Sequence, residues 1–342
     1  MIKIFIGELL PKIPHTEILF PNLGNGEREN PFGEKIFASF TKPLVEIVEK
    51  PELADYLCIP HNYNYIKNKS EYLASFEALA GSYSKKILIF FPGDSDAEVP
   101  LRNSIVFRNS QYKASQRPNE VVIPGYAAHL GEKYGIHLRS KAEKATTGFC
   151  GWATPSSFRG WIAFILAHVK PTPRTQGLYF RIKALNVLKK SRDIISHFII
   201  RSSYSGSAKT LRVDPLEARK DYVENIQNSD FTLSPKGDGN FSIRFFETLS
   251  LGRIPLLIDT DCPLPLENEI AYDDFILRVS YKDIKNLPSI VANFYSSLSQ
   301  EEFEGKQKKC LEAFEKYLKI DAFFAHVLRE DFLNKIAYTK SN

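Results

Sequence analysis

SDFTLSPKGDGNFSIRFFETLSLGRIPLLIDTDCPLP occupies residues 229–265 of this 342-residue chain and is its most informative stretch for the fold class. Two short β-branched and aromatic runs, Phe231–Ser234 and Ile254–Ile258, predict strands. Between them Phe241–Leu251 has the length and periodicity of a helix, and Gly252 follows as a residue that ends it. A strand, a helix and a second strand form a βαβ unit, which favours a parallel sheet covered by helices.

The loop inside this unit carries Lys236, Gly237 and Gly239. Ligands of open α/β sheets bind beyond the carboxyl ends of the strands, where this loop lies. The glycines let backbone N–H groups approach a phosphate, and the next helix adds the positive end of its dipole. Arg244 supplies further positive charge for a departing diphosphate, and Glu247, one turn later, presents a carboxylate to ribose hydroxyls. The same pattern also fits a surface ion pair beside an ordinary turn.

Strand-like and helix-like runs alternate along the whole chain and predict two α/β domains. Residues 139–146 are polar without an apolar period, so we divide the chain into residues 1–143, residues 144–320 and a C-terminal helix, residues 321–342, that packs back on the first domain. The other expected strands are Ile2–Ile6, Tyr56–Pro60, Lys86–Phe91, Ser104–Phe107, Val121–Pro124, Thr147–Cys150 and His197–Ser202. The other expected helices are Phe32–Phe40, Tyr65–Tyr83, Ser157–His168, Leu178–Ser191, Leu216–Gln227, Asp283–Leu298, Glu301–Tyr317 and Asp321–Ala337.

The composition is that of a globular protein, with 43% hydrophobic and 25% charged residues. The formal net charge of +5 is small, and without a dense basic tract it does not favour nucleic acid as a partner. Four cysteines without a CxxC pair predict reduced thiols rather than disulfides or zinc. We find no signal peptide and no apolar run of the ~20 residues that a membrane span needs, so we expect a soluble, cytoplasmic protein.

The motif S-x-F-x-L-x-P-K-G, followed by S-x-R-x-x-E-x-x-x-x-G-x-I-P-L, runs from residue 229 to residue 256 and resembles the signature of the exostosin family of glycosyltransferases. Weaker resemblances follow the family's order over roughly residues 50–320, at Ala54–His61, Leu88–Asp94, Val121–Tyr126 and Phe149–Gly151 with Arg159. The resemblance implies a GT-B fold, in which two Rossmann-like domains face a central cleft. It also implies polysaccharide biosynthesis by an inverting transfer of a hexosyl, pentosyl or uronosyl group.

The same resemblance implies a nucleotide-sugar donor, UDP- or GDP-linked, a glycan or lipid-linked glycan acceptor, and no required cofactor or divalent metal. Carried over to the matching positions, it places Lys236, Ser242 and Arg244 at the diphosphate and Glu247 at the ribose. The donor-binding residues implied in this way are Arg159, Lys236, Gly237, Ser242, Arg244 and Glu247.

An inverting transferase needs a base that takes the proton of the acceptor hydroxyl. The candidates lie after strands of the first domain and are His61, Asp94 and Asp96, although His61 equally suits a turn and the two aspartates a solvated loop. Asp94-Ser95-Asp96 also spells the DxD of metal-dependent transferases, as does Asp259-Thr260-Asp261. Two alternatives therefore stay open: a metal-dependent DxD transferase, and an inactive scaffold that binds nucleotide or glycan.

Residues 170–192 combine seven basic residues with a series of apolar ones. This pattern predicts either peripheral contact with the inner face of an anionic membrane or a helix that packs on its own sheet and leaves its basic side in water.

Overall fold

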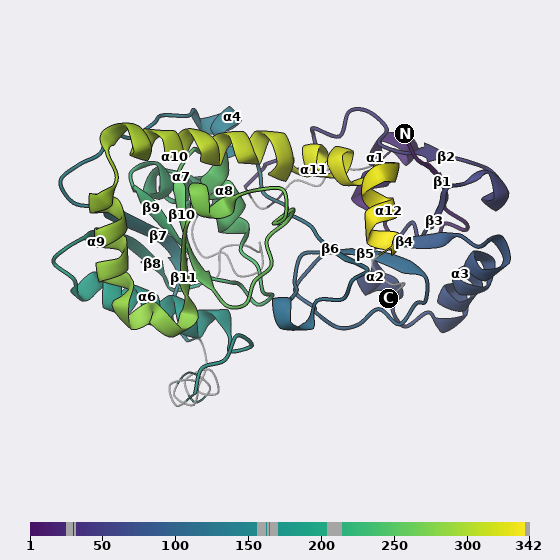
Figure 1. The fold of residues 1–342 in the computed structure, drawn as a ribbon, viewed down its shortest axis with the longest axis horizontal. Coiled ribbons are helices and arrows are strands. Elements are labelled where there is room, and N and C mark those ends of the chain that lie inside the picture. The colour runs from purple at the N-terminus through teal and green to yellow at the C-terminus, as the bar shows by residue number, and fades with distance from the viewer. Residues whose placement is uncertain are drawn as a thin grey trace.

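The computed structural model describes residues 1–24, 30, 32–155, 162, 164, 170–203 and 214–338. They form two parallel sheets at opposite ends of an elongated molecule, each flanked by helices (Figure 1). Such a pair of α/β domains is what the GT-B prediction requires, and the predicted fold class is confirmed.

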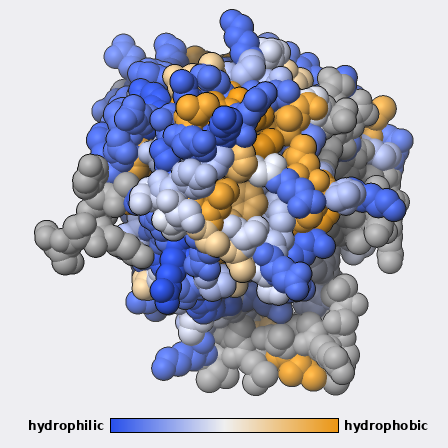
Figure 2. All heavy atoms as spheres, turned by 90° about the vertical axis from the view of Figure 1, so that its right-hand side faces the viewer, coloured by the Kyte–Doolittle hydropathy of each residue, from blue (hydrophilic) through white to orange (hydrophobic). Residues whose placement is uncertain are grey.

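The first sheet has the strand order β2-β1-β3-β4-β5-β6, and every pairing is parallel. Helices α2 and α3 cover one of its faces, where they share a core with β3 and β4. Viewed from this end, hydrophilic side chains surround a smaller apolar area of the surface (Figure 2). The elements of this domain are β1 Lys3–Phe5, α1 Phe20–Leu23, β2 Glu46–Ile47, β3 Tyr56–Cys58, α2 Tyr63–Ile66, α3 Ser70–Tyr83, β4 Lys86–Phe91, β5 Ser104–Arg108, β6 Glu120–Val122 and α4 Leu130–Tyr134.

The second sheet has the order β11-β10-β9-β7-β8, again with parallel pairing throughout. Its central strand, β9, lies between the first strand of the domain and β10, so the carboxyl ends of β7 and β9 are neighbours. The elements are β7 Thr146–Trp152, α6 Gly177–Lys190, β8 Ile195–Arg201, α7 Pro215–Gln227, β9 Phe231–Ser234, α8 Ile243–Ser250, β10 Ile254–Asp259, β11 Leu277–Ser280, α9 Leu287–Ser297 and α10 Gln300–Ala313.

The end of the chain returns to the first domain as two helices, α11 Ile320–Val327 and α12 Glu330–Tyr338 (yellow in Figure 1). Phe324 packs edge-on against Phe90 and Phe107, with ring centroids 5.8 and 6.2 Å away. All three rings are fully buried, and burial of each contributes about 1.5–3 kcal/mol. These contacts join the C-terminal helices to the core of the first domain.

Three helix predictions are wrong in the described residues. The helix predicted at Tyr65–Tyr83 is two helices, α2 and α3, separated at Lys67–Lys69. The segment predicted as a helix at Phe32–Phe40 forms turns, because the Asn30 side chain accepts hydrogen bonds from the backbone N–H groups of Phe32 and Glu34 and Gly33 adopts a φ of 68°. The helix predicted at Asp321–Ala337 is two helices, and the break lets Val327 and Leu333 both reach the core. Most of the helix predicted at Ser157–His168 lies outside the described residues.

Candidate functional site

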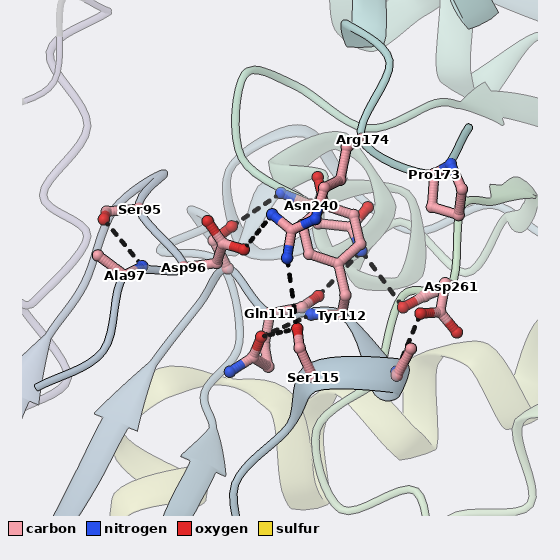
Figure 3. Close-up of polar contacts among 12 residues, drawn as sticks. Ser95, Asp96, Ala97, Gln111, Tyr112, Ser115, Pro173, Arg174, Asn240 and Asp261 are labelled. Carbon is pink, nitrogen blue, oxygen red and sulfur yellow. Dashed lines mark hydrogen bonds and ion pairs between the residues drawn. The ribbon is translucent and has the colours of Figure 1, made fainter. Parts of the chain in front are cut away.

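The loop after β9 lies at the contact between the two domains. The Gly239 N–H donates to Oδ1 of Asp94 at 3.0 Å, and the Asn240 N–H donates to Oγ of Ser110 at 2.9 Å. Asn240 is fully buried, and its amide donates to the Gln111 carbonyl at 2.9 Å (Figure 3). The loop predicted to bind phosphate therefore also joins the second domain to the first.

Lys236 is buried in this loop, and its Nζ donates to the Tyr112 hydroxyl at 3.0 Å and to the Pro173 carbonyl at 2.7 Å. Burial lowers the pKa of the amine to about 8. An ammonium group has three N–H donors, so one remains for a ligand. Gly177, at the start of α6, packs so closely on this loop that a Cβ there would lie 2.3 Å from the Gly237 carbonyl oxygen.

Arg244 lies in the first turn of α8 and is held at the carboxyl ends of β7 and β9. Its Nη2 donates to the Cys150 carbonyl at 2.7 Å, and its guanidinium lies 4.1 Å from the centroid of the Phe149 ring. Gly151 makes this position possible, because a Cβ there would lie 2.9 Å from Nη2. Nε is buried without a hydrogen-bond partner among the described residues. The guanidinium is thus fixed at the place where ligands of α/β sheets bind.

Glu247 lies one turn after Arg244 on α8 and is only 7% exposed. Its Oε1 accepts a hydrogen bond from Nη2 of Arg219 at 2.7 Å, and its Oε2 accepts one from the Tyr222 hydroxyl at 2.6 Å. Arg219 also donates from Nε and Nη2 to Glu34 of the first domain. We call Glu34, Arg219, Tyr222 and Glu247 the Arg219 cluster.

The charges of the Arg219 cluster keep each donor protonated. Burial by itself lowers the pKa of Arg219, but the charges of Glu247 and Glu34 outweigh that effect and raise it above its ordinary value. Burial also raises the pKa of Tyr222, and the charge of Glu247 raises it further. The ring of Tyr222 lies 5.5 Å from the Arg244 guanidinium, so this one tyrosine contacts both site residues of α8.

The sequence reasoning missed Arg219 and Tyr222, although one signal was present. Arg219 begins an apolar helical series that continues with Tyr222, Val223 and Ile226, at spacings of three, four and seven residues. A charged residue on the buried face of a helix needs a buried partner. Arg219 is 28 residues from Glu247 and 185 residues from Glu34 along the sequence, so local patterns do not identify these partners.

His61, one of the three predicted bases, is buried and uses both ring nitrogens. Nε2 accepts a hydrogen bond from the Leu10 N–H at 2.9 Å, and Nδ1 lies 3.1 Å from the Pro14 carbonyl. Burial lowers its pKa, so the ring is neutral near pH 7. His61 thus ties residues 10–14 to β3 and has no free nitrogen for the proton of a substrate.

Asp94 and Asp96 lie in the loop after β4 and face different partners. Asp94 is exposed at the surface, and among the described residues it accepts a hydrogen bond only from the Gly239 N–H. Partial loss of contact with water raises the pKa of its carboxyl, and this effect outweighs the lowering by that hydrogen bond. Asp96 forms an ion pair with Arg174 at 2.5 Å (Figure 3). The Arg108 guanidinium holds the loop through the Ser95 and Ala97 carbonyls. Asp94 is therefore the carboxylate that contacts the predicted phosphate loop.

Ser242, Arg159 and the second DxD are the remaining predicted positions. Ser242 is the residue before α8 and makes no capping hydrogen bond, while Arg159 lies outside the described residues. In the second DxD, Asp259 accepts the Cys262 N–H and Asp261 accepts the Ala114 N–H, both at 3.0 Å. Within the described ranges, no group of three or more His, Cys, Asp or Glu side chains is arranged to hold a metal ion.

The basic segment 170–192 contains α6, whose apolar residues Phe180, Leu185 and Leu188 are buried in the domain core. Lys189 and Lys190 are exposed. Peripheral membrane contact through this segment stays a prediction. Among the helices that the structure describes, none combines the length and the apolar character required to span a bilayer.

Comparison with known proteins agrees with the predicted family. Residues 153–294 match the family model described as the Exostosin GT47 domain. A probable glucuronosyltransferase of Oryza sativa subsp. japonica is 29% identical over 134 residues, which are 37% of this chain and 30% of that protein. The Exostosin-1 homolog of Caenorhabditis elegans is 30% identical over 112 residues, or 32% of this chain and 28% of the relative.

A probable β-1,4-xylosyltransferase of Arabidopsis thaliana is 28% identical over 134 residues, with 37% of this chain and 32% of the relative covered. The match thus spans less than a third of the length of each of these curated relatives. A crystal structure of TarM aligns with 76% of this chain and 58% of its own at 10% identity and a TM-score of 0.32, a likeness too small to carry an argument. Residues 153–294 of this chain are thus similar to the GT47 domain of exostosin-like glycosyltransferases.

Proposed function

We propose that the protein transfers a sugar from a nucleotide-diphosphate donor, UDP- or GDP-linked, to a glycan or lipid-linked glycan. The observation that carries this proposal is the pair Arg244 and Glu247, a fixed guanidinium and a carboxylate one helical turn apart at the carboxyl ends of β7 and β9. One group suits a diphosphate and the other suits ribose hydroxyls, within the segment that matches the GT47 domain.

The departing diphosphate gains negative charge in the transition state, and fixed cations stabilise that charge most effectively. Arg244 supplies one cation. Lys236 supplies a second through its remaining N–H donor, since a pKa of about 8 leaves most of the amine charged at pH 7. With two cations at the diphosphate, the proposed transfer needs no divalent metal.

Inversion at the sugar requires a base on the acceptor side. We assign this role to Asp94, because its carboxylate is exposed, contacts the loop of Lys236 and has a pKa raised by partial burial. A raised pKa improves a carboxylate as a base near neutral pH.

The test is a calorimetric and thermal-shift screen of the full chain against UDP, GDP, CDP, ADP and dTDP, each with and without EDTA. We expect one of these nucleotides to bind the wild type and to lose about tenfold or more in affinity to Glu247→Ala, since a hydrogen bond to a charged group contributes about 1.5–3 kcal/mol. Binding that EDTA abolishes would favour the metal-dependent alternative. Binding without any sugar transfer would favour the inactive scaffold.

A further inference from the structure

The carboxylate of Glu247 is held by two donors from α7, the Arg219 guanidinium and the Tyr222 hydroxyl. We propose that Tyr222 and Arg219 orient Glu247 toward the ribose, so that the Tyr222 hydroxyl sets how strongly the protein prefers ribonucleotides to dideoxyribonucleotides. This inference rests on the proposed function and adds a specificity-determining residue to its donor site.

The Glu247 carboxylate can accept more hydrogen bonds than the two that it receives from α7. An ionised carboxylate has about four acceptor positions on its two oxygens. Arg219 takes one position on Oε1 and Tyr222 takes one on Oε2, so each oxygen keeps capacity for a ribose hydroxyl. With a donor on each oxygen, the carboxylate is held in one orientation before a ligand arrives, which reduces the entropy lost on binding.

The two positioning residues differ in what else they hold. Arg219 is buried between Glu34 and Glu247, so its removal leaves two buried carboxylates without their cation. The Tyr222 hydroxyl donates only to Glu247 among the described residues, while its ring contacts the guanidinium groups of Arg219 and Arg244. Tyr222→Phe therefore removes one donor and keeps the ring contacts.

The loss of this donor has a distinct consequence for ligands. Without it, Glu247 is held on one oxygen only and turns more freely about its terminal bond. A ribonucleotide then loses part of its hydrogen bonding to the carboxylate, whereas a 2′,3′-dideoxynucleotide has no hydroxyl there to lose. A purely structural role for Tyr222 would weaken both ligands equally.

The experiment is titration calorimetry of the full chain with the nucleoside diphosphate that binds best in the screen and with its 2′,3′-dideoxy analogue. The proteins are the wild type, Tyr222→Phe and the isosteric Glu247→Gln, with thermal midpoints measured to show that each is folded. Tyr272→Phe is the matched control, because its hydroxyl also lies in the second domain, is buried and donates to the Pro265 carbonyl at 2.8 Å.

We expect the wild type to prefer the ribonucleotide by about 10–100-fold, as for hydrogen bonds to a charged group. Tyr222→Phe should lower this ratio about five- to tenfold through weaker ribonucleotide binding, and Tyr272→Phe should leave it unchanged. An unchanged ratio in Tyr222→Phe overturns the inference and leaves the proposed function intact. Absence of binding of all five nucleotides to the wild type overturns both.

Discussion

Glu34 of the first domain and Arg219 of the second form a buried ion pair with two hydrogen bonds, Nε to Oε1 at 2.7 Å and Nη2 to Oε2 at 2.6 Å. Through Nη2 the same guanidinium reaches Glu247. The carboxylate proposed to bind ribose is therefore linked to the first domain by a single arginine.

Replacing Glu34 with Gln should lower the free energy of unfolding by about 2–3 kcal/mol. Breaking a buried ion pair costs about 3–5 kcal/mol. The cost is smaller here because Glu247 still pairs with the buried charge of Arg219. Urea unfolding followed by circular dichroism measures the change.

Glu98→Gln is the matched control for this substitution, since Glu98 is exposed and pairs with Arg117 at 3.5 Å. Its effect should stay below about 1 kcal/mol. Equal effects of the two substitutions would mean that the Glu34–Arg219 pair adds nothing to the domain contact.

Arg244→Ala should reduce turnover by about 10²–10³-fold, the usual loss when a fixed donor to developing charge is removed. The measurement is the initial rate of sugar transfer with the donor whose nucleotide binds in the screen. Arg329→Ala, a change of an exposed arginine, is the control and should retain the wild-type rate. Near-normal turnover in a folded Arg244→Ala protein would remove Arg244 from the chemistry.

Gly239→Ala should weaken the contact between the domains. A Cβ at this position would lie 2.7 Å from Cα of Asp94, so the two loops must separate. We expect the free energy of unfolding to fall by about 1–3 kcal/mol, as at other overpacked sites. Thermal or urea unfolding measures the change.

Gly305→Ala provides the comparison, because Gly305 lies inside α10 with open space around it. An alanine there favours the helix by up to about 1 kcal/mol and should stabilise the protein. A Gly239→Ala protein as stable as the wild type would show that the two loops can move apart without loss of stability.

The stability of the protein relative to Lys236→Met should rise with pH above about 8. Burial lowers the pKa of Lys236 from 10.5 in the unfolded chain to about 8 in the folded one. Below pH 8 the amine is charged in both states, so the folded state is destabilised by the full free energy of burying that charge. Between pH 8 and 10.5 the folded state releases the proton first, so that cost disappears.

Urea unfolding of both proteins at pH 7, 8, 9 and 10 measures this difference, because the other titrating groups are common to both. Parallel stability profiles would mean that the amine keeps its ordinary pKa when the protein is folded.

Local sequence patterns were sufficient for the two α/β domains and for the central motif. The strand predicted at Phe231–Ser234 is β9 without a change, and the helix predicted at Leu216–Gln227 starts one residue earlier as α7. Strand and helix periods are properties of neighbouring residues, so a short window contains them. The spacing of Arg244 and Glu247 is equally local, and both side chains do lie together on α8 beside Tyr222.

Local patterns could not identify contacts between residues that are far apart in the sequence. Glu34 was assigned to a helix that does not form, and nothing near it indicates Arg219. His61 looked available at a strand end until residues 10–14 were placed over it. A charged or polar side chain takes whichever partner the packing of distant segments brings into the same buried space, and that choice is a property of the folded chain as a whole.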